Sequence, residues 1–488
     1  MAFPNRTLKP NPFIPDPSFI RQYQISAIKR LCGTKRMILG DDVGLGKTLE
    51  ALAAFSYMKT QLPELKMLVF TEVAAIGQWE EEVEKFTKGL TVEKVTARTP
   101  KKERDDIFRR LKADITVTSY SLVHRNYMAM LYGMQRIAPM LVADEPTAFK
   151  NTKSKLHEKM LTLAGYCPRV YGLTATPVEN SLVEMWGMFR VIVPGLFPTK
   201  KFFMDRWCVV QQNHWTGFNE ITGYKNLRDY REHISPHYFG RLQTDPSVDQ
   251  ELPDVIYKDV RFDLPPKTAE AYEDAENRMD PNGEPITVLP ALSIQQDLCN
   301  DPTLQGIDEP SPKIEALRDM LLGSLANEKV AVFTKRRVLV DTIELLLRKD
   351  GHKVVRITGA ESPAERTVAR QTFQNHDGPV VMLLTKAGGR ALNLQAGGHL
   401  IFFDLPWSYG QTRQVIGRLK RVGSSHRRIA VYFFLARASG RPTIDQHVLS
   451  VVKKKKVLFN AVLGDDDDIK TTKSDLAEII AEIQRSKK

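Results

Sequence analysis

The chain has 488 residues, and its 70 Lys and Arg against 58 Asp and Glu give a formal net charge of +12. This length exceeds what one ordinary hydrophobic core holds, so we expect two to four domains. The basic charge favours a polyanionic partner, although a basic protein without such a partner has the same composition. The four cysteines form no C-x-x-C pair, no apolar run reaches the ~18 residues of a membrane span, and the Pro-rich N-terminus lacks a signal-peptide core. We therefore expect a reducing compartment, without zinc site, disulfide framework or membrane segment.

In the first part of the chain, short apolar runs alternate with amphipathic stretches. The runs predict strands at 37–40, 67–70, 115–120, 140–145 and 169–176, and the stretches between them predict helices at 48–62, 77–88 and 100–112. Alternation of this kind is typical of a parallel sheet with helices on both faces.

The same alternation returns near residue 312. Strands are predicted at 330–334, 353–358, 380–385, 400–405 and 429–436, and helices at 338–351 and 362–374. We therefore predict an α/β fold with two tandem RecA-like parallel-sheet lobes and a mainly helical insertion between them. The predicted domains are an N-terminal arm (1–20), lobe 1 (21–190), the insertion (191–311), lobe 2 (312–463) and a C-terminal tail (464–488).

The strongest local motif is GDDVGLGKT at 40–48, between a predicted strand and a predicted helix. Gly44 and Gly46 let the backbone turn its N–H groups toward a phosphate, and the helix N-terminus favours an anion. Lys47 supplies a positive charge to the β- and γ-phosphates, and Thr48 a hydroxyl ligand for Mg²⁺. A structural Gly-rich turn is the alternative interpretation.

Two acids, Asp144 and Glu145, end the predicted strand 140–145. The first carboxylate is placed to hold Mg²⁺ and the second to orient or deprotonate an attacking water. Thr174 and Thr176 lie at the end of another predicted strand, where their hydroxyls are candidates to sense the γ-phosphate and couple it to the polymer side. Solvated loop acids and a Thr/Pro turn are the competing interpretations.

In the second block, QVIGRLKRVG (414–423) predicts a helix with Arg418 and Arg421 on one face. Two arginines facing an ATP bound on the first lobe would neutralise charge that develops on the γ-phosphoryl group. The Gly-rich stretch 385–397 is suited to close approach to a phosphodiester, although a structural turn also fits it.

Taken in order, these motifs resemble superfamily 2 helicases, and among them the Swi/Snf-type DNA-dependent ATPases, over most of residues 20–465. RQYQISAIKRL resembles the adenine-side Gln motif, GDDVGLGKT motif I, and MLVFTEVAAIGQWEEEVEKF motif Ia. ITVTSYSLV resembles motif Ib, VADEPTAFKN the DEAH-type box, and GLTATPVENSLVEMWGMF motif III. VAVFTKRRVLVDTIELLL, GGRALNLQAGGHLIFFDLPW and QVIGRLKRVGS resemble motifs IV, V and VI.

The resemblance implies ATP hydrolysis to ADP and phosphate, stimulated by DNA, with Mg²⁺. The implied catalytic residues are Lys47, Asp144, Glu145, Arg418 and Arg421, with Thr48 and Asp144 as metal ligands. The implied nucleotide contacts are Gln24, Asp42, Val43, Gly44, Leu45, Gly46, Lys47, Thr48 and Gly389. The implied DNA contacts are Thr71, Glu72, Gln78, Ser119, Tyr120, Thr334, Lys335, Arg336, Thr385, Lys386 and Arg390.

Two positions depart from the family pattern, because Thr147 replaces the final His of the box and motif VI ends in Gly-Ser. The short insertion and the lack of chromatin-reading segments favour a compact phage or bacterial motor, working as a monomer in the cytoplasm of a bacterium or an infected cell. We expect a helicase or translocase that remodels forks and Holliday junctions, binding duplex or branched DNA without sequence preference. Three alternatives stay open: a duplex translocase that displaces bound protein, the motor subunit of a defence system, and a binding module with a degenerate ATPase.

Overall fold

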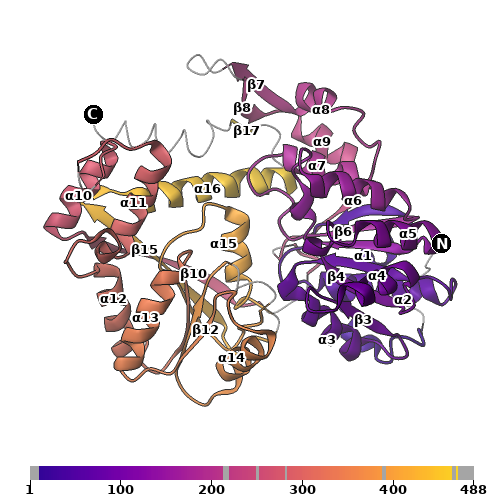
Figure 1. The fold of residues 1–488 in the computed structure, drawn as a ribbon, viewed down its shortest axis with the longest axis horizontal. Coiled ribbons are helices and arrows are strands. Elements are labelled where there is room, and N and C mark those ends of the chain that lie inside the picture. The colour runs from indigo at the N-terminus through magenta and orange to yellow at the C-terminus, as the bar shows by residue number, and fades with distance from the viewer. Residues whose placement is uncertain are drawn as a thin grey trace. The chain divides into compact units, whose positions relative to one another are not determined.

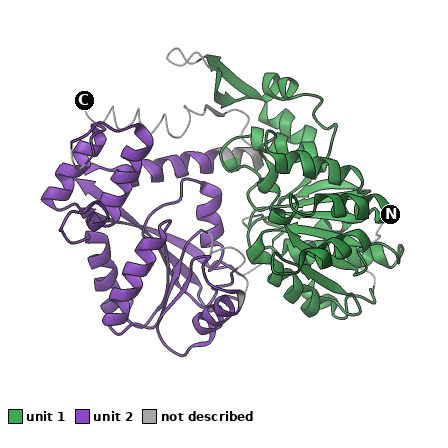
Figure 2. Cartoon of the chain, in the orientation of Figure 1, with its two compact units in different colours: residues 1–250, 458–471 green, residues 251–457, 472–488 purple. Residues whose placement is uncertain are grey.

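A computed structural model of the chain describes residues 10–212, 219–243, 245–248, 252–280, 283–386, 392–421, 423–463 and 469–470. The chain divides into two compact units (Figure 2): unit 1 comprises residues 1–250 and 458–471, and unit 2 comprises residues 251–457 and 472–488. Within the described ranges, no helix is both long and apolar enough to cross a membrane.

Unit 1 is built on a parallel sheet of seven strands in the order β3-β4-β2-β5-β6-β1-β9. All six pairings between neighbours are parallel. The strands are β1 (Arg36–Leu39), β2 (Met67–Thr71), β3 (Val92–Val95), β4 (Ile115–Ser119), β5 (Met140–Asp144), β6 (Arg169–Leu173) and β9 (Tyr238–Phe239).

Successive side chains of the central strands enter two different hydrophobic clusters. Leu68 and Phe70 of β2 belong to one cluster, and Met67 and Val69 belong to the other. Because side chains alternate across a strand, a strand buried on both faces reads as a continuous apolar run. This is why the five inner strands of the unit 1 sheet were predicted from the sequence, whereas its partly exposed edge strands β3 and β9 were not.

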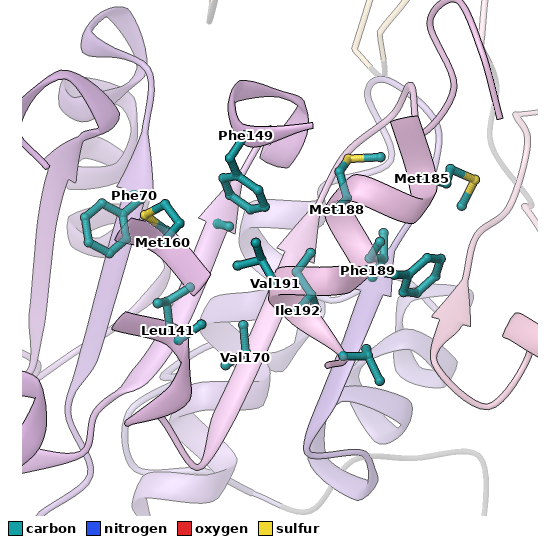
Figure 3. Close-up of a cluster of buried hydrophobic side chains, with 14 of the residues drawn as sticks. Phe70, Leu141, Phe149, Met160, Val170, Met185, Met188, Phe189, Val191 and Ile192 are labelled. Carbon is teal, nitrogen blue, oxygen red and sulfur yellow. The ribbon is translucent and has the colours of Figure 1, made fainter. Parts of the chain in front are cut away.

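Helices cover both faces of this sheet (Figure 1). In the first cluster, Val191 and Ile192 of α7 lie with Leu141 and Val170 of the strands (Figure 3). The helices of unit 1 are α1 (Gln24–Gly33), α2 (Lys47–Lys59), α3 (Ile76–Phe86), α4 (Lys101–Arg110), α5 (Tyr127–Ile137), α6 (Lys155–Gly165), α7 (Val183–Ile192), α8 (Lys200–Trp207) and α9 (Leu227–Ile234). A small antiparallel sheet in the order β17-β8-β7 is made by β7 (Cys208–Gln212), β8 (Asn219–Tyr224) and β17 (Ile469–Lys470).

Unit 2 has a second parallel sheet, in the order β10-β15-β14-β11-β13-β12, to which β16 adds an antiparallel pairing with β15. Its strands are β10 (Asp254–Asp263), β11 (Lys329–Phe333), β12 (Val354–Ile357), β13 (Val380–Leu384), β14 (His399–Phe402), β15 (Arg428–Ala438) and β16 (Arg441–Pro442). Its helices are α10 (Pro266–Glu276), α11 (Val288–Asn300), α12 (Pro312–Leu322), α13 (Arg337–Lys349), α14 (Pro363–Asn375), α15 (Tyr409–Ile416) and α16 (Ile444–Leu463). Two clusters again lie on opposite faces of the sheet. The predicted fold class, two parallel-sheet α/β lobes, is confirmed.

The stretch 191–311, where we expected a helical insertion, is divided between the two units. It contains helices α8 to α11, but β9 extends the sheet of unit 1 and β10 extends the sheet of unit 2. β10 pairs with β15 over ten residues, yet most of its side chains are partly or fully exposed. An exposed edge strand carries no continuous apolar run, so β10 has no strand pattern in its sequence.

The predicted N-terminal arm and C-terminal tail are described only in part. In the arm, Ile14 and Ile20 are buried in a cluster with the first helices of unit 1, and residues 1–9 lie outside the described ranges. In the tail, residues 464–468 and the residues from 471 onward also lie outside them. All four cysteines are buried and carry free thiols.

Candidate active site

The phosphate loop joins the end of β1 to the start of α2. Gly44 and Gly46 adopt φ angles of 83° and 84°, a left-handed conformation that favours glycine. α2 begins at Lys47, whose Nζ donates to the carbonyls of Asp41 at 2.8 Å and Asp42 at 3.1 Å. The loop therefore directs a helix N-terminus and an ammonium group toward one place, which is an arrangement suited to bind phosphate.

The start of α1 contacts this loop directly. The Tyr23 hydroxyl and the Gln24 carboxamide both donate to the Leu45 carbonyl at 2.9 Å. Gln24 is buried, and its Oε1 accepts from the Arg21 backbone N–H at 2.9 Å. Both ends of this carboxamide thus have protein partners, and its expected contact with an adenine base stays a prediction.

Asp144, the last residue of β5, receives two neutral donors on one carboxylate oxygen. The Thr71 hydroxyl donates to its Oδ2 at 2.8 Å and the Trp79 indole N–H at 2.9 Å. Burial raises the pKa of this carboxyl, and the two hydrogen bonds together with Lys47 act in the opposite direction. Its second oxygen, Oδ1, accepts no hydrogen bond from the described residues, so it is available to another ligand.

Glu145 follows with a left-handed backbone, at a φ of 55°. Its N–H continues the pairing with β6 by donating to the Leu173 carbonyl at 2.8 Å, and its Oε2 accepts from the Thr174 hydroxyl at 2.8 Å. Desolvation, reinforced by the neighbouring Asp144, raises the pKa of Glu145 to about 7. A carboxylate with a pKa near neutrality is a competent general base.

Thr174 and Thr176, which we predicted to sense the γ-phosphate and couple it to the DNA side, form a short hydrogen-bonded turn. The Thr176 N–H donates to the Thr174 hydroxyl oxygen at 3.1 Å, and both side chains are buried. Thr174 therefore joins the candidate base to the loop after β6. The role of the pair as a γ-phosphate sensor stays a prediction.

The two candidate arginines of unit 2 do not lie on a helix, so this part of the sequence prediction is wrong. α15 ends at Ile416, with Gly417 as its C-cap. The next backbone N–H groups bond to carbonyls two to four residues back, so Arg418 and Arg421 lie in a tight turn. Arg418 is buried, with Nη1 3.5 Å from the Leu392 carbonyl, and the Nε of Arg421 donates to Gly417 O at 3.1 Å.

The predicted DNA contacts of unit 1 differ in exposure. Thr71, Ser119 and Tyr120 are buried; Ser119 bonds Ser121, and Tyr120 donates to the Asp144 carbonyl at 2.9 Å. Glu72 and Gln78 are partly exposed. The assignment of these five residues as DNA contacts stays a prediction. Among them, only Glu72 and Gln78 have side chains accessible to solvent.

In unit 2 the predicted DNA contacts mostly bond within the protein. The hydroxyls of Thr334 and Thr385 are buried and donate to Asp404 at 3.2 Å and to the Thr358 carbonyl at 2.6 Å. Lys335 contacts Gln296 at 3.2 Å, and Arg336 pairs with Asp297 at 2.7 Å. Lys386 is exposed, whereas Gly389 and Arg390 lie outside the described residues.

The donors present indicate which residues could hold a metal in this site. Thr48 is partly exposed in the first turn of α2, and Asp144 keeps Oδ1 available on the strand end. One hydroxyl and one carboxylate are the hard oxygen ligands that suit Mg²⁺, which also keeps waters and phosphate oxygens. No group of three or more His, Cys, Asp or Glu side chains capable of holding a metal occurs in the described part of the chain.

Sequence reasoning missed two contributors to this site. Trp79 lies in the stretch that resembles motif Ia, and its indole N–H bonds to the carboxylate of Asp144. Arg241 lies in no predicted motif, yet it forms ion pairs with Asp41 and with Glu50, both fully buried. Two acids in an apolar stretch beside the phosphate loop, Asp41 and Glu50, indicate that a cation lies near them in the fold. They do not indicate that this cation, Arg241, lies about 200 residues later in the sequence.

Comparison with known proteins identifies both parts of the chain. Residues 23–304 match the model of the SNF2-related domain, and residues 312–423 match the helicase conserved C-terminal domain. An uncharacterized ATP-dependent helicase of Mycoplasma pneumoniae is 27% identical over 463 residues, which cover 92% of this chain and 42% of the relative. The ISWI chromatin-remodeling complex ATPase ISW2 of Saccharomyces cerevisiae is 26% identical over 501 residues, covering 93% of this chain and 43% of that protein.

The chain thus spans less than half the length of these two relatives. A third relative, the uncharacterized ATP-dependent helicase YqhH of Bacillus subtilis, is 24% identical over 468 residues, which cover 89% of this chain and 78% of YqhH. Among solved structures, the SWI2/SNF2 ATPase core of Sulfolobus solfataricus in complex with dsDNA matches with a TM-score of 0.43 and 23% identity, covering 93% of this chain and 94% of that chain. The family model covers more than half of the chain, in the region that contains the phosphate loop and the acid pair. The chain therefore belongs to the SNF2-related family and carries the helicase conserved C-terminal domain after it.

Proposed function

We propose that this protein is a DNA-dependent ATPase that hydrolyses ATP to ADP and phosphate and works as a DNA helicase or translocase. The observation that carries the proposal is the carboxyl edge of the unit 1 sheet. There the phosphate loop follows β1, Asp144 and Glu145 follow β5, and Thr174 follows β6, with β5, β6 and β1 adjacent in the sheet. Membership of the SNF2-related family and relatives named ATP-dependent helicases support it.

The side chains divide the chemistry among them. Lys47 and the N-terminus of α2 bind the phosphates of ATP, and the raised pKa lets Glu145 accept a proton from the attacking water. Bound Mg²⁺, held by Thr48 and Asp144, would neutralise charge on the phosphate oxygens. Thr174 orients the Glu145 carboxylate through their 2.8 Å hydrogen bond. Arg418 and Arg421 supply the positive charge that we predicted for the transition state.

DNA binding is proposed to rest on the phosphate backbone, because a motor must move without regard to sequence. The net charge of +12 favours such a partner. Lys386 is an exposed cation in the second-unit segment that resembles motif V. We propose that the substrates are duplex or branched DNA, remodelled at forks and Holliday junctions in replication, recombination or repair, by a monomer in a bacterial or phage-infected cytoplasm.

The test measures ATP turnover and strand separation side by side on single-stranded, duplex, forked and four-way DNA. We expect DNA to stimulate turnover and the forked and four-way substrates to be separated. ATPase stimulated by duplex without any strand separation would instead favour a translocase that displaces bound proteins. Turnover that no DNA changes would contradict the proposal as a whole.

A further inference from the structure

A segment far along the chain runs beside the phosphate loop. Residues 237–243, here named the strap, include β9, which pairs with β1. Three backbone hydrogen bonds join the two segments, the first within β1 and the other two beyond its end: Ile38 N–H to His237 O at 2.8 Å, Gly40 N–H to Phe239 O at 2.6 Å and Asp42 N–H to Arg241 O at 2.9 Å. The first half of the phosphate loop is therefore an extension of the sheet, bordered by the strap.

Side chains add to this backbone contact. The Gln243 N–H donates to Asp42 Oδ2 at 3.1 Å, and its carboxamide donates to the Val43 carbonyl at 2.7 Å. A β-carbon at Gly40 would overlap the Tyr238 hydroxyl, so the strap lies as close to the loop as a glycine allows. The strap thus holds the first half of the loop through both backbone and side-chain contacts.

Arg241 is the centre of this contact. Its guanidinium bonds both carboxylate oxygens of Asp41, and it reaches Glu50 Oε1 of α2 at 2.8 Å. A further N–H donates to the Tyr23 carbonyl at the start of α1. The guanidinium also lies 5.0 Å from the ring centroids of Tyr23 and Phe239.

Because this group of charged side chains is buried, removing one of its members should lower the free energy of unfolding. Arg241 is 6% exposed, and Asp41 and Glu50 are 0% exposed. Burial and the neighbouring Asp41 raise the pKa of Glu50 well above its usual value, and the Arg241 guanidinium acts in the opposite direction because it attracts both carboxylates. Only a planar guanidinium has enough donors in a fixed fork to bond both acids and a carbonyl together.

We propose that Arg241 is a positioning residue of the ATPase, which sets the conformation of the phosphate loop by joining it to α1, to α2 and to the strap. It bonds Asp41 within the loop, Glu50 in the helix that Lys47 begins, and Tyr23 beside Gln24. The inference rests on the proposed ATPase function, and it assigns to Arg241 no contact with ATP. The strap ends at residue 243, and unit 2 begins at residue 251.

The test compares Arg241→Lys with the wild-type full-length chain, measuring kcat and KM for ATP and the melting temperature. Lysine keeps the positive charge but cannot bond Asp41, Glu50 and Tyr23 together. We expect kcat/KM for ATP to fall about 10²-fold, the loss associated with displacing reacting groups by about 1 Å. Arg104→Lys is the matched control, since Arg104 is a buried arginine of unit 1 that bonds Asn126 and the carbonyls of Ala97 and Thr99 instead.

A double variant, Glu50→Gln with Arg241→Gln, separates positioning from stability. Removing one acid together with the cation lessens the buried charge imbalance, so we expect the melting temperature to recover relative to Arg241→Gln alone, while kcat/KM stays low. Recovery of both, or a wild-type kcat/KM in Arg241→Lys, would overturn the positioning role. If the wild-type chain shows no ATP turnover, both the proposed function and this inference are wrong. If the wild type turns over ATP and Arg241→Lys does so equally well, only the positioning role is wrong.

Discussion

The acidic side chains at the carboxyl edges of the two parallel sheets differ in their exposure and in their hydrogen bonds. At the carboxyl end of β5 in unit 1, Asp144 and Glu145 are partly exposed, and the Oδ1 of Asp144 accepts no hydrogen bond from the described residues. At the corresponding end of β14 in unit 2, Asp404 is 2% exposed. It accepts from the Thr334 hydroxyl, the Lys335 N–H and the Asn300 carboxamide at 3.2, 2.7 and 3.3 Å.

An acid at a strand end is therefore not by itself a candidate for chemistry. Asp404 is bonded on both oxygens by its own unit, so it stabilises the edge of the sheet. Asp144 is bonded on one oxygen, and Glu145 has a raised pKa, so these two retain capacity for a ligand and a proton. The expected consequence is that variants at the unit 1 edge change turnover, whereas variants at the unit 2 edge change stability.

The largest effect is expected for Arg421→Ala, which tests whether unit 2 contributes to chemistry through its arginines. An arginine that neutralises transition-state charge is worth about 10³-fold or more in kcat. We expect a loss of this size with an ATP dissociation constant close to that of the wild type, measured by steady-state turnover and equilibrium binding. Arg427→Ala, at an exposed position in the same region, is the control; a loss of affinity alone would make Arg421 a binding residue.

Lys47→Ala tests the phosphate loop of unit 1. Removing one preorganised positive group from a transition state costs about 10²- to 10³-fold in turnover. We expect this loss with duplex DNA binding largely retained, as measured by turnover and fluorescence anisotropy. Lys35→Ala, also in unit 1 and exposed, should behave as the wild type. Unchanged turnover in Lys47→Ala would remove the loop from the mechanism.

A smaller effect is expected for Thr174→Val, which removes the donor to Glu145 without changing the side-chain shape. A hydrogen bond to a charged group contributes about 1.5–3 kcal/mol, and 1.36 kcal/mol corresponds to a factor of ten in rate. We therefore expect kcat to fall roughly tenfold or more. The comparison variant is Thr162→Val, whose exposed hydroxyl bonds the Glu158 carbonyl in α6; an equal fall in both would exclude a specific role for Thr174.

The smallest effect on turnover is expected for Asp404→Asn at the unit 2 edge. The change weakens acceptance of three hydrogen bonds and should lower the free energy of unfolding by about 1–3 kcal/mol. Denaturant unfolding followed by circular dichroism measures this loss. Asp263→Asn is the control, because its pair with Arg437 is largely exposed and should contribute less than about 1 kcal/mol. If Asp404→Asn lowered turnover while the free energy of unfolding stayed that of the wild type, the contrast between the two edges would be wrong.

The sequence predicted those parts of the fold in which local pattern and burial agree. The strands expected at 67–70 and 140–145 correspond to β2 (Met67–Thr71) and β5 (Met140–Asp144), since strands covered on both faces are continuously apolar. β10 was not predicted because its exposed edge position removes this pattern. The helix expected over 414–423 ends at Ile416 because Gly417 caps it and tight-turn bonds follow.

The candidate site divides in the same way. The phosphate loop and the acid pair were visible because each is a contiguous motif beside a predicted strand. The contacts of Trp79 with Asp144 and of Arg241 with Asp41 join residues 65 and 200 positions apart, and only the sheet topology brings them together. Residues of this kind have no local signature, so the structure is needed to find them.

At the carboxyl edge of the unit 1 sheet, we expect Glu145 to act in ATP hydrolysis and not in ATP binding. The most direct measurement is ATP affinity and single-turnover hydrolysis, in the presence of duplex DNA, for the wild type and Glu145→Gln, with Glu158→Gln on the exposed surface of α6 as the control. We expect Glu145→Gln to bind ATP like the wild type while hydrolysis slows about 10²- to 10⁴-fold, the contribution of a general base. Hydrolysis at a near-normal rate in Glu145→Gln would contradict this expectation.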